Sequence, residues 1–219
     1  AVGIVAATLC SPSRGPTSLI NTSMSMSSFL RRRQGDAAKT RCGCGLRGRR
    51  ALEAQQRTHE AVVAAPAFAA FVQMEMAEAG YAAVAEFHYL HHAPGGAPYA
   101  DRAEMSARIA AAAAESGLGL TLLPVLYQQG GCDGRALGAG QLRFGNDPDG
   151  FGSLWQGAGQ ALAGLPADTR LGVAPHSLRA VSRGGLTFAQ DLAPDAPLHL
   201  HIAEQVAEVT EVQAAYGAR

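Results

Sequence analysis

Apolar residues alternate along the chain between a spacing typical of helices and short continuous runs typical of buried strands. Over residues 58–80 the apolar positions recur every three or four residues, which predicts a helix that ends at Gly80. The run at residues 81–87 predicts a strand, and a loop rich in proline and glycine follows it at residues 93–98. The patterned part of the chain therefore begins with a helix and a strand.

The order of helix and strand continues to the end of the chain. Asp101 is a favourable N-cap residue and predicts a helix to Ser116, after which residues 118–126 have the profile of a strand buried on both faces. Residues 128–150 are rich in glycine and predict a long surface loop at the rim of a site. The remaining predicted elements are a helix at residues 151–164, a strand at 171–175, a helix ending at Leu192, a strand at 197–203 and a helix from Glu204. Every connection between strands is long enough for a helix, so we expect a parallel sheet of βα units, either open and doubly wound or part of a (β/α)8 barrel.

Charge divides the sequence into two parts. The formal net charge is zero, but residues 1–50 carry nine Lys or Arg and one acidic residue, Asp36, whereas the rest carries nine basic and seventeen acidic residues. This asymmetry predicts a basic N-terminal segment of low order at residues 1–57 and a folded α/β part at residues 58–219.

Three interpretations of the basic segment stay open. The one that we favour is a mis-framed or misjoined gene model. The richness in Ser and Arg around residues 24–33 also resembles an organelle transit peptide. An arm that binds nucleic acid ranks last, because no aromatic residues are interleaved with Arg31, Arg32 and Arg33.

Cysteine spacing and hydropathy exclude two broad classes of protein. The four cysteines lack the regular spacing of a disulfide framework, which favours a reducing compartment. No apolar stretch reaches the roughly 18 to 20 residues that cross a bilayer, so we expect no membrane association.

Polar side chains follow the predicted strands at the points where those strands end. The residues concerned are His88, Tyr89, Tyr127, His176, and His201 with Glu204. Because the carboxyl ends of parallel strands meet at one edge, which carries function in α/β folds, we expect these residues to line a site.

The sequence allows more than one role for several charged and histidine residues near these strand ends. His199 and His201 lie two apart on a predicted strand and share a face, which suits metal binding, although two histidines cannot complete a zinc site. Glu204 could hold a proton near a metal-bound water, or it could simply be an acid in the first turn of a helix. Arg179 could grip a substrate carboxylate or lie on a helix surface. His91 and the following His92 predict a solvated loop rather than a ligand pair.

Four stretches resemble one family in their order and spacing. They are GYAAVAEFHYLHH at residues 80–92, GLTLLPVLY at 119–127, HSLRAV at 176–181 and LHLHIAEQ at 198–205. Together they resemble successive strand motifs of formimidoylglutamate deiminase, a family of the amidohydrolase superfamily. The resemblance covers about residues 58–219 and implies strands 2 to 5 of a metal-dependent (β/α)8 barrel.

The resemblance also implies an activity. Enzymes of this family hydrolyse N-formimidoyl-L-glutamate to N-formyl-L-glutamate and ammonia in histidine degradation, using one zinc ion. His201 matches the metal ligand and Glu204 the proton-shuttling carboxylate, while Tyr89, His176 and Arg179 match positions that contact the glutamate portion of the substrate. We accordingly expect a cytoplasmic homodimer that acts on this small molecule and binds neither nucleic acid nor a membrane.

Other parts of the family pattern do not match this sequence. The H-x-H metal pair of strand 1 would lie before Thr58, where nothing matches, and the strand-6 His and strand-8 Asp would lie beyond Arg219. We therefore expect the chain as given to be inactive and poorly stable. The alternatives are another deaminase of the amidohydrolase superfamily, such as one acting on a nucleobase, and a non-catalytic remnant that binds a partner.

Overall fold

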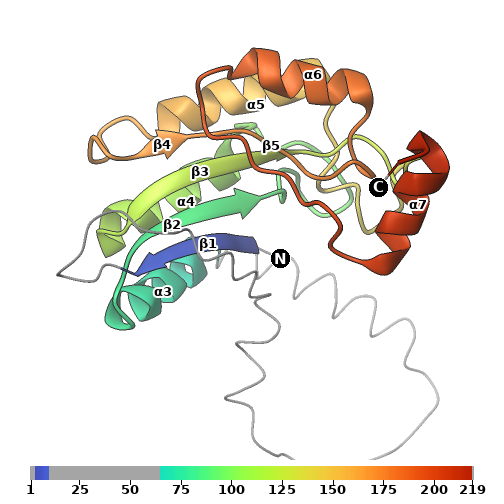
Figure 1. Cartoon of the computed structure of the whole chain (residues 1–219). Helices are drawn as coiled ribbons and strands as arrows, with labels where there is room; N and C mark the ends of the chain where they lie inside the picture. Colours follow the sequence, from blue (N-terminus) through green and yellow to red (C-terminus); the bar gives the residue numbers. More distant parts are fainter. Residues whose placement is uncertain (1–2, 10–64, 219) are drawn as a thin grey trace, which may run out of the picture.

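The structure is a computed structural model that describes residues 3–9 and 65–218 (Figure 1). The elements in chain order are β1 (Gly3–Leu9), α3 (Ala65–Glu78), β2 (Tyr81–His88), α4 (Glu104–Ser116), β3 (Gly119–Leu126), α5 (Pro148–Ala161), β4 (Arg170–Leu171), β5 (Ala174–Pro175), α6 (Arg183–Leu192) and α7 (Val206–Tyr216). The predicted alternation of helices and strands is therefore present from α3 to α7.

A parallel sheet forms the centre of the molecule. Strand β2 pairs with β3, and β3 pairs with both β4 and β5 further along its length, all in parallel register. Since each of these parallel connections passes through at least one helix, the sheet is built from βα units as the sequence predicts.

The N-terminal strand was not expected. Gly3–Leu9 pairs antiparallel with β2, although it lies in the segment for which we expected low order. Residues 10–57 of that segment are outside the described residues, as are residues 58–64 of the first predicted helix. The proposed division at residue 57 stays a prediction.

Two predicted strands have a different form in the structure. The strand expected at residues 171–175 is divided into β4 and β5. The strand expected at residues 197–203 is instead an extended segment that touches the sheet through two isolated bridges, Val173 with Leu198 and Ser177 with His201. The apolar pattern was recognisable, but a strand also needs a continuous ladder of hydrogen bonds. In this segment the Pro197 carbonyl accepts from the Val173 amide, and the His199 and His201 amides donate to the Val173 and His176 carbonyls, without forming a continuous ladder.

Two helices begin about three residues away from their predicted starts. Asp101 Oδ1 accepts a hydrogen bond from the Ala103 amide, which forms a turn ahead of α4. Helix α5 begins at Pro148 because Asp147 caps it by accepting from the Gly150 amide. The predicted stop of α4 at Gly117 is confirmed: its φ of 73° is left-handed, and its amide donates to the Ala113 carbonyl.

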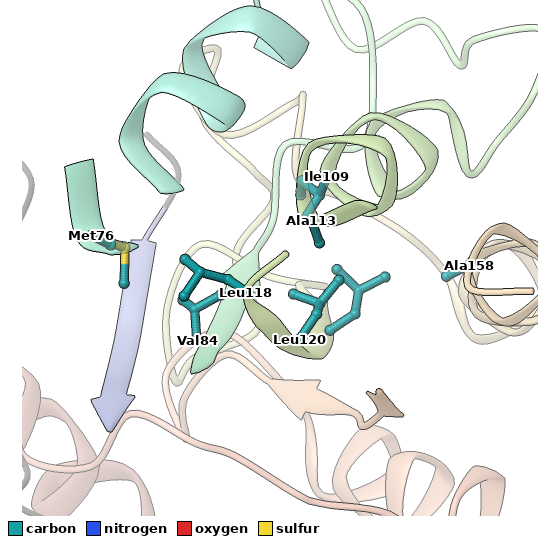
Figure 2. Close-up of a cluster of buried hydrophobic side chains, with 8 residues drawn as sticks. Met76, Val84, Ile109, Ala113, Leu118, Leu120 and Ala158 are labelled. Carbon is teal, nitrogen blue, oxygen red and sulfur yellow. The ribbon is translucent and has the colours of Figure 1, made fainter. Parts of the chain in front are cut away.

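Side chains of β3 are buried on both faces of the sheet, as predicted. On one face Leu120 and Leu122 pack with Val84 of β2 against Ile109 of α4 and Ala158 of α5 (Figure 2). On the other face the buried cluster consists of Phe87, Leu123, Val125 and Ala174. This second face leads to the polar residues at the strand ends, so the helices and the site lie on opposite sides of the sheet.

Among the described residues, no helix combines the length and the apolar character that crossing a membrane requires.

Candidate functional site

Six rings gather where the parallel strands end. They belong to Phe87, Tyr89, Tyr127, Phe144, His176 and His201. Tyr89, Tyr127 and His176 directly follow strands, and His201 lies beside them through its isolated bridge to Ser177, so the structure brings these four residues together at one edge.

The two imidazoles of this ring cluster are stacked. Their centroids are 5.1 Å apart and their planes differ by 13°. The His201 amide donates to the His176 carbonyl at 2.9 Å, which holds the two backbones side by side, and the ring of Phe87 lies 4.3 Å from that of His201. Burial lowers the pKa of His176 to about 3, with smaller effects from His201 and from Arg179. His176 is therefore neutral at pH 7 and can offer a lone pair as well as an N–H.

Tyr89 connects the ring cluster to Glu204. Its ring stands edge-on to His176, with centroids 5.8 Å apart, and edge-on to Phe144 at 4.6 Å. Burial raises the pKa of Tyr89, and the charge of Glu204 and the neighbouring Tyr127 raise it further. The Glu204 carboxylate is thus close enough to act electrostatically on the Tyr89 hydroxyl, while Glu204 itself is exposed.

Arg179 reaches the same edge through Tyr127. Its Nη1 donates to the Tyr127 hydroxyl at 3.2 Å. Burial lowers the pKa of Arg179, but the hydrogen bond to Tyr127 and the charges of Glu208 and Glu211 outweigh that effect and raise it overall. The guanidinium therefore keeps its charge beside the rings, which suits a ligand that carries a carboxylate.

The residues of the described ranges do not form a metal site on their own. Within residues 3–9 and 65–218 no three side chains of His, Cys, Asp or Glu gather closely enough to hold an ion. His199 is partly buried, and burial lowers its pKa. The metal role of His201 stays a prediction, as do the roles of Glu204, Tyr89, His176 and Arg179.

The expectation of a solvated His91–His92 loop is wrong. Nε2 of His91 lies 2.8 Å from the Val125 carbonyl, Nε2 of His92 lies 2.7 Å from the Gly145 carbonyl, and both side chains are buried. Their backbone amides both donate to the Arg143 carbonyl. The loop is buried because residues 143–145, about fifty positions away in the chain, fold over it.

His88 lies on the opposite face from the ring cluster. Its Nε2 is 3.0 Å from Oγ of Ser106 on α4, and both side chains are buried. Successive residues of a strand point to opposite faces, so His88 faces the helices when Phe87 and Tyr89 face the site. The expectation that His88 lines the site is therefore wrong.

Two residues of the site come from the glycine-rich loop, as expected for a rim, but the sequence did not single them out. Phe144 packs against Tyr89 and Tyr127, and Nε2 of Gln141 donates to the Tyr127 hydroxyl at 2.8 Å. An aromatic residue among many glycines is a signal that could have found Phe144, whereas nothing local distinguishes Gln141.

The chain is similar to known proteins along much of its length. None of the family models searched matches it. It is 47% identical over 147 residues to formimidoylglutamate deiminase from Pseudomonas aeruginosa, an alignment that covers 67% of this chain and 32% of that protein. The structure resembles the crystal structure of an amidohydrolase from Brucella melitensis with a TM-score of 0.73 and 39% identity, covering 100% of this chain and 45% of that one.

A further structural neighbour shows the fold alone. It is an adenosine deaminase from Xanthomonas campestris with bound zinc, with a TM-score of 0.50 and 21% identity, covering 75% of this chain and 33% of that one.

These comparisons confirm both the resemblance and the fold. The chain resembles formimidoylglutamate deiminase, and its fold is a partial (β/α)8 barrel of the amidohydrolase type. It spans about a third of the curated relative and under half of the amidohydrolase.

Proposed function

We propose, on the premise of a partial amidohydrolase barrel that resembles formimidoylglutamate deiminase, that the whole protein hydrolyses N-formimidoyl-L-glutamate to N-formyl-L-glutamate and ammonia in histidine degradation. The observation that carries this proposal is the position of Arg179, a charged guanidinium beside the ring cluster at the carboxyl edge of the sheet. A carboxylate-bearing substrate needs such a group, and a flat neutral base does not.

The substrate-binding part of the proposal uses three side chains. Arg179 binds a carboxylate of the glutamate portion through parallel N–H donors. His176 is neutral, so it can donate to or accept from the substrate without bringing a second charge next to Arg179. The Tyr89 hydroxyl, protonated because its pKa is raised, donates a further hydrogen bond.

The proton-transfer part uses Glu204. Water adds to the amidine carbon, and Glu204 takes a proton from it as general base. The same carboxyl group delivers this proton to the terminal nitrogen, which gives a tetrahedral carbon bearing OH and NH2. Glu204 then passes the hydroxyl proton to the NH2 group, the C–N bond breaks as the C=O bond forms, and ammonia leaves with N-formyl-L-glutamate as the other product. The exposure of Glu204 and its effect on Tyr89 support this assignment.

Zinc enters the proposal only for the whole protein. A zinc site takes three or four protein ligands, and among the described residues no such group gathers, so His201 would supply one ligand of a larger set. Bound zinc would lower the pKa of a water molecule toward neutrality, and no step through it follows from the residues described. Accordingly we propose that the 219-residue chain by itself does not turn over substrate.

Two other functions compete with this proposal. One is a different deaminase of the superfamily, such as one acting on a nucleobase. The other is a non-catalytic remnant that binds a partner, which we expect to melt cooperatively as a monomer, whereas a broken barrel would aggregate. Under the deiminase proposal, the whole protein is a cytoplasmic homodimer.

The test measures ammonia release by the whole protein, whose sequence is first determined by sequencing the transcript beyond both ends of these 219 residues. We expect activity on N-formimidoyl-L-glutamate and none on adenine or cytosine. Arg179→Met should raise KM for the glutamate derivative by about tenfold or more, the loss of one charge-assisted contact. Ammonia release by the purified 219-residue chain with added zinc would overturn the expectation that it is inactive.

Arg183→Met is the matched control. This arginine begins helix α6, and its guanidinium carbon lies 4.9 Å from the centre of the Tyr216 ring. It should leave KM unchanged. An unchanged KM in Arg179→Met as well would favour the nucleobase deaminase.

A further inference from the structure

The Tyr127 hydroxyl is surrounded by groups that can only donate. Arg179 Nη1 lies 3.2 Å from it, and an arginine has no acceptor. Gln141 Nε2 lies 2.8 Å from it. The orientation of this amide follows from its other end, because Gln141 Oε1 accepts from the Gly138 amide at 2.8 Å. Turning the amide over would set its NH2 group against a backbone N–H, so Gln141 must donate to Tyr127.

The hydroxyl proton of Tyr127 is therefore not used in either of these hydrogen bonds. Both hydrogen bonds use the oxygen as acceptor, and the structure provides no acceptor for the O–H among the described residues. Tyr127 is 3% exposed, so the unused donor is buried in the protein and does not reach bulk water. A buried donor without an acceptor costs free energy unless a ligand supplies one.

The ring of Tyr127 is held in place independently of its hydroxyl. It packs edge-on against His176, with centroids 4.7 Å apart, and against Phe144 at 5.7 Å. Its backbone carbonyl accepts from the Asn146 amide at 3.0 Å. The position of the hydroxyl oxygen is thus set by the rings and by Gln141, and only the direction of the proton is left to the ligand.

We propose that the Tyr127 hydroxyl is a specificity-determining contact, which donates a hydrogen bond to the same carboxylate that Arg179 binds. Two features of its surroundings raise its strength as a donor: the cationic guanidinium and the amide of Gln141 both withdraw electron density from the oxygen. The two oxygens of a carboxylate can accept hydrogen bonds from both Arg179 and Tyr127. A carboxamide has one oxygen, and its NH2 group would place a second donor against Arg179 or Tyr127. The pair thereby selects carboxylate over carboxamide. This inference deepens the proposed function and rests on it for the identity of the substrate.

The test uses the full chain and glutarate as the probe, with glutaramide as its uncharged analogue. Tyr127→Phe removes the hydroxyl and keeps the ring contacts to His176 and Phe144. We expect it to weaken glutarate binding, measured by calorimetry, about tenfold without changing the melting temperature by more than a few degrees. Tyr216→Phe is the matched control. It removes a hydroxyl that donates to the Leu178 carbonyl at 3.3 Å, and it should change the affinity by less than about twofold.

A second measurement distinguishes a direct contact between Tyr127 and the ligand from an indirect effect in which Tyr127 only positions Arg179. The ¹³Cζ resonance of labelled Tyr127, assigned by its loss in Tyr127→Phe, reports hydrogen bonding at the hydroxyl. It should move on addition of glutarate and stay in place with glutaramide. A resonance that does not move, a Tyr127→Phe chain that binds glutarate as tightly as the parent, or a parent chain without measurable affinity for glutarate each overturns the inference.

The same titration distinguishes the inference from the proposed function. If the chain binds glutarate through Tyr127 but gains no affinity from the formimidoyl group of N-formimidoyl-L-glutamate, the carboxylate contact stands and the proposed substrate fails.

Discussion

The backbone amide of Glu204 donates a hydrogen bond of 3.0 Å to Oε2 of Glu208. Glu208 is 7% exposed, whereas Glu204 is exposed. Just before this bond Ala203 has a φ of 56°, in the left-handed region that residues other than glycine rarely adopt. The buried carboxylate therefore holds a costly turn, and that turn carries Glu204 to the edge where Tyr89 lies.

Replacing Glu208 should release this turn. Glu208→Ala removes the acceptor, and we expect a loss of about 1 to 3 kcal/mol in the free energy of unfolding, measured by urea denaturation, with faster hydrogen exchange at the Glu204 amide. Glu208→Gln keeps a side-chain oxygen that can accept the hydrogen bond from the Glu204 amide, so its free energy of unfolding should fall less. Glu115→Ala, a change of the same kind at an exposed position of α4, is the control and should lose nothing. Equal stability of the Glu208→Ala and Glu115→Ala chains would refute this role.

Gly172 allows the segment after α6 to reach the sheet. A Cβ atom at this position would lie 2.4 Å from the Pro197 carbonyl oxygen and 2.5 Å from Cδ2 of Leu123. Gly172→Ala should therefore destabilise the fold by about 2 kcal/mol or more, because backbone must move to relieve the contact. Trp155 is the one tryptophan of the sequence and donates its indole N–H to the Gly172 carbonyl at 2.9 Å, so its fluorescence follows the change directly.

Gly184→Ala provides the control for that change. No atom lies within 4 Å of a Cβ built at Gly184, which is in α6, so alanine should leave stability unchanged or raise it by about 0.5 kcal/mol. Similar stabilities of the two variants would show that the close approach at Gly172 is not required.

Glu86 should make stability fall as the pH rises. It is 4% exposed on β2, and burial raises its pKa from 4.5 to about 8. Between these values the folded chain binds more protons than the unfolded chain, so stability decreases as the pH rises through this window. Glu86→Gln should remove the effect, gaining about 2 kcal/mol relative to the parent between pH 6 and pH 8.

His91 has the opposite effect at lower pH. Burial lowers its pKa to about 4 from 6.5, although the Val125 carbonyl partly offsets this, so the stability that depends on neutral His91 is lost as the pH falls through that interval. Melting temperatures measured above pH 6.5 therefore isolate Glu86. A Glu86→Gln chain whose stability follows the parent's pH dependence there would contradict the assignment.

The buried ring of His88 has a hydrogen-bond partner at Nε2, the hydroxyl of Ser106, whereas its Nδ1 has none among the described residues. Ser106→Ala should leave both ring nitrogens unpaired and destabilise the fold by about 1 to 3 kcal/mol. Combining it with His88→Leu removes the unpaired groups and should recover part of the loss in thermal denaturation. Ser153→Ala, at an exposed serine of α5, should have little effect. If the double variant is no more stable than Ser106→Ala alone, the loss does not come from the unpaired ring.

Local chemistry explains which elements could be predicted. The apolar run of β3 and the left-handed glycine that ends α4 depend on neighbours a few residues away, so both were recognisable. The N-cap of α5 is also local, and Asp147 followed by Pro148 was a signal that was missed. The burial of His92 depends on the Gly145 carbonyl, which no local pattern can report.

The sequence pattern alone predicts that Tyr89 and His176 meet, because residues that follow parallel strands lie at one edge of the sheet whatever the details of packing. The face that His88 takes depends instead on tertiary packing, because alternation along a strand defines two faces but does not say which one the helices cover. The hydrogen bond from Gln141 to the Tyr127 hydroxyl depends on tertiary packing too, since a contact between a loop and a strand end is set by how the loop folds back.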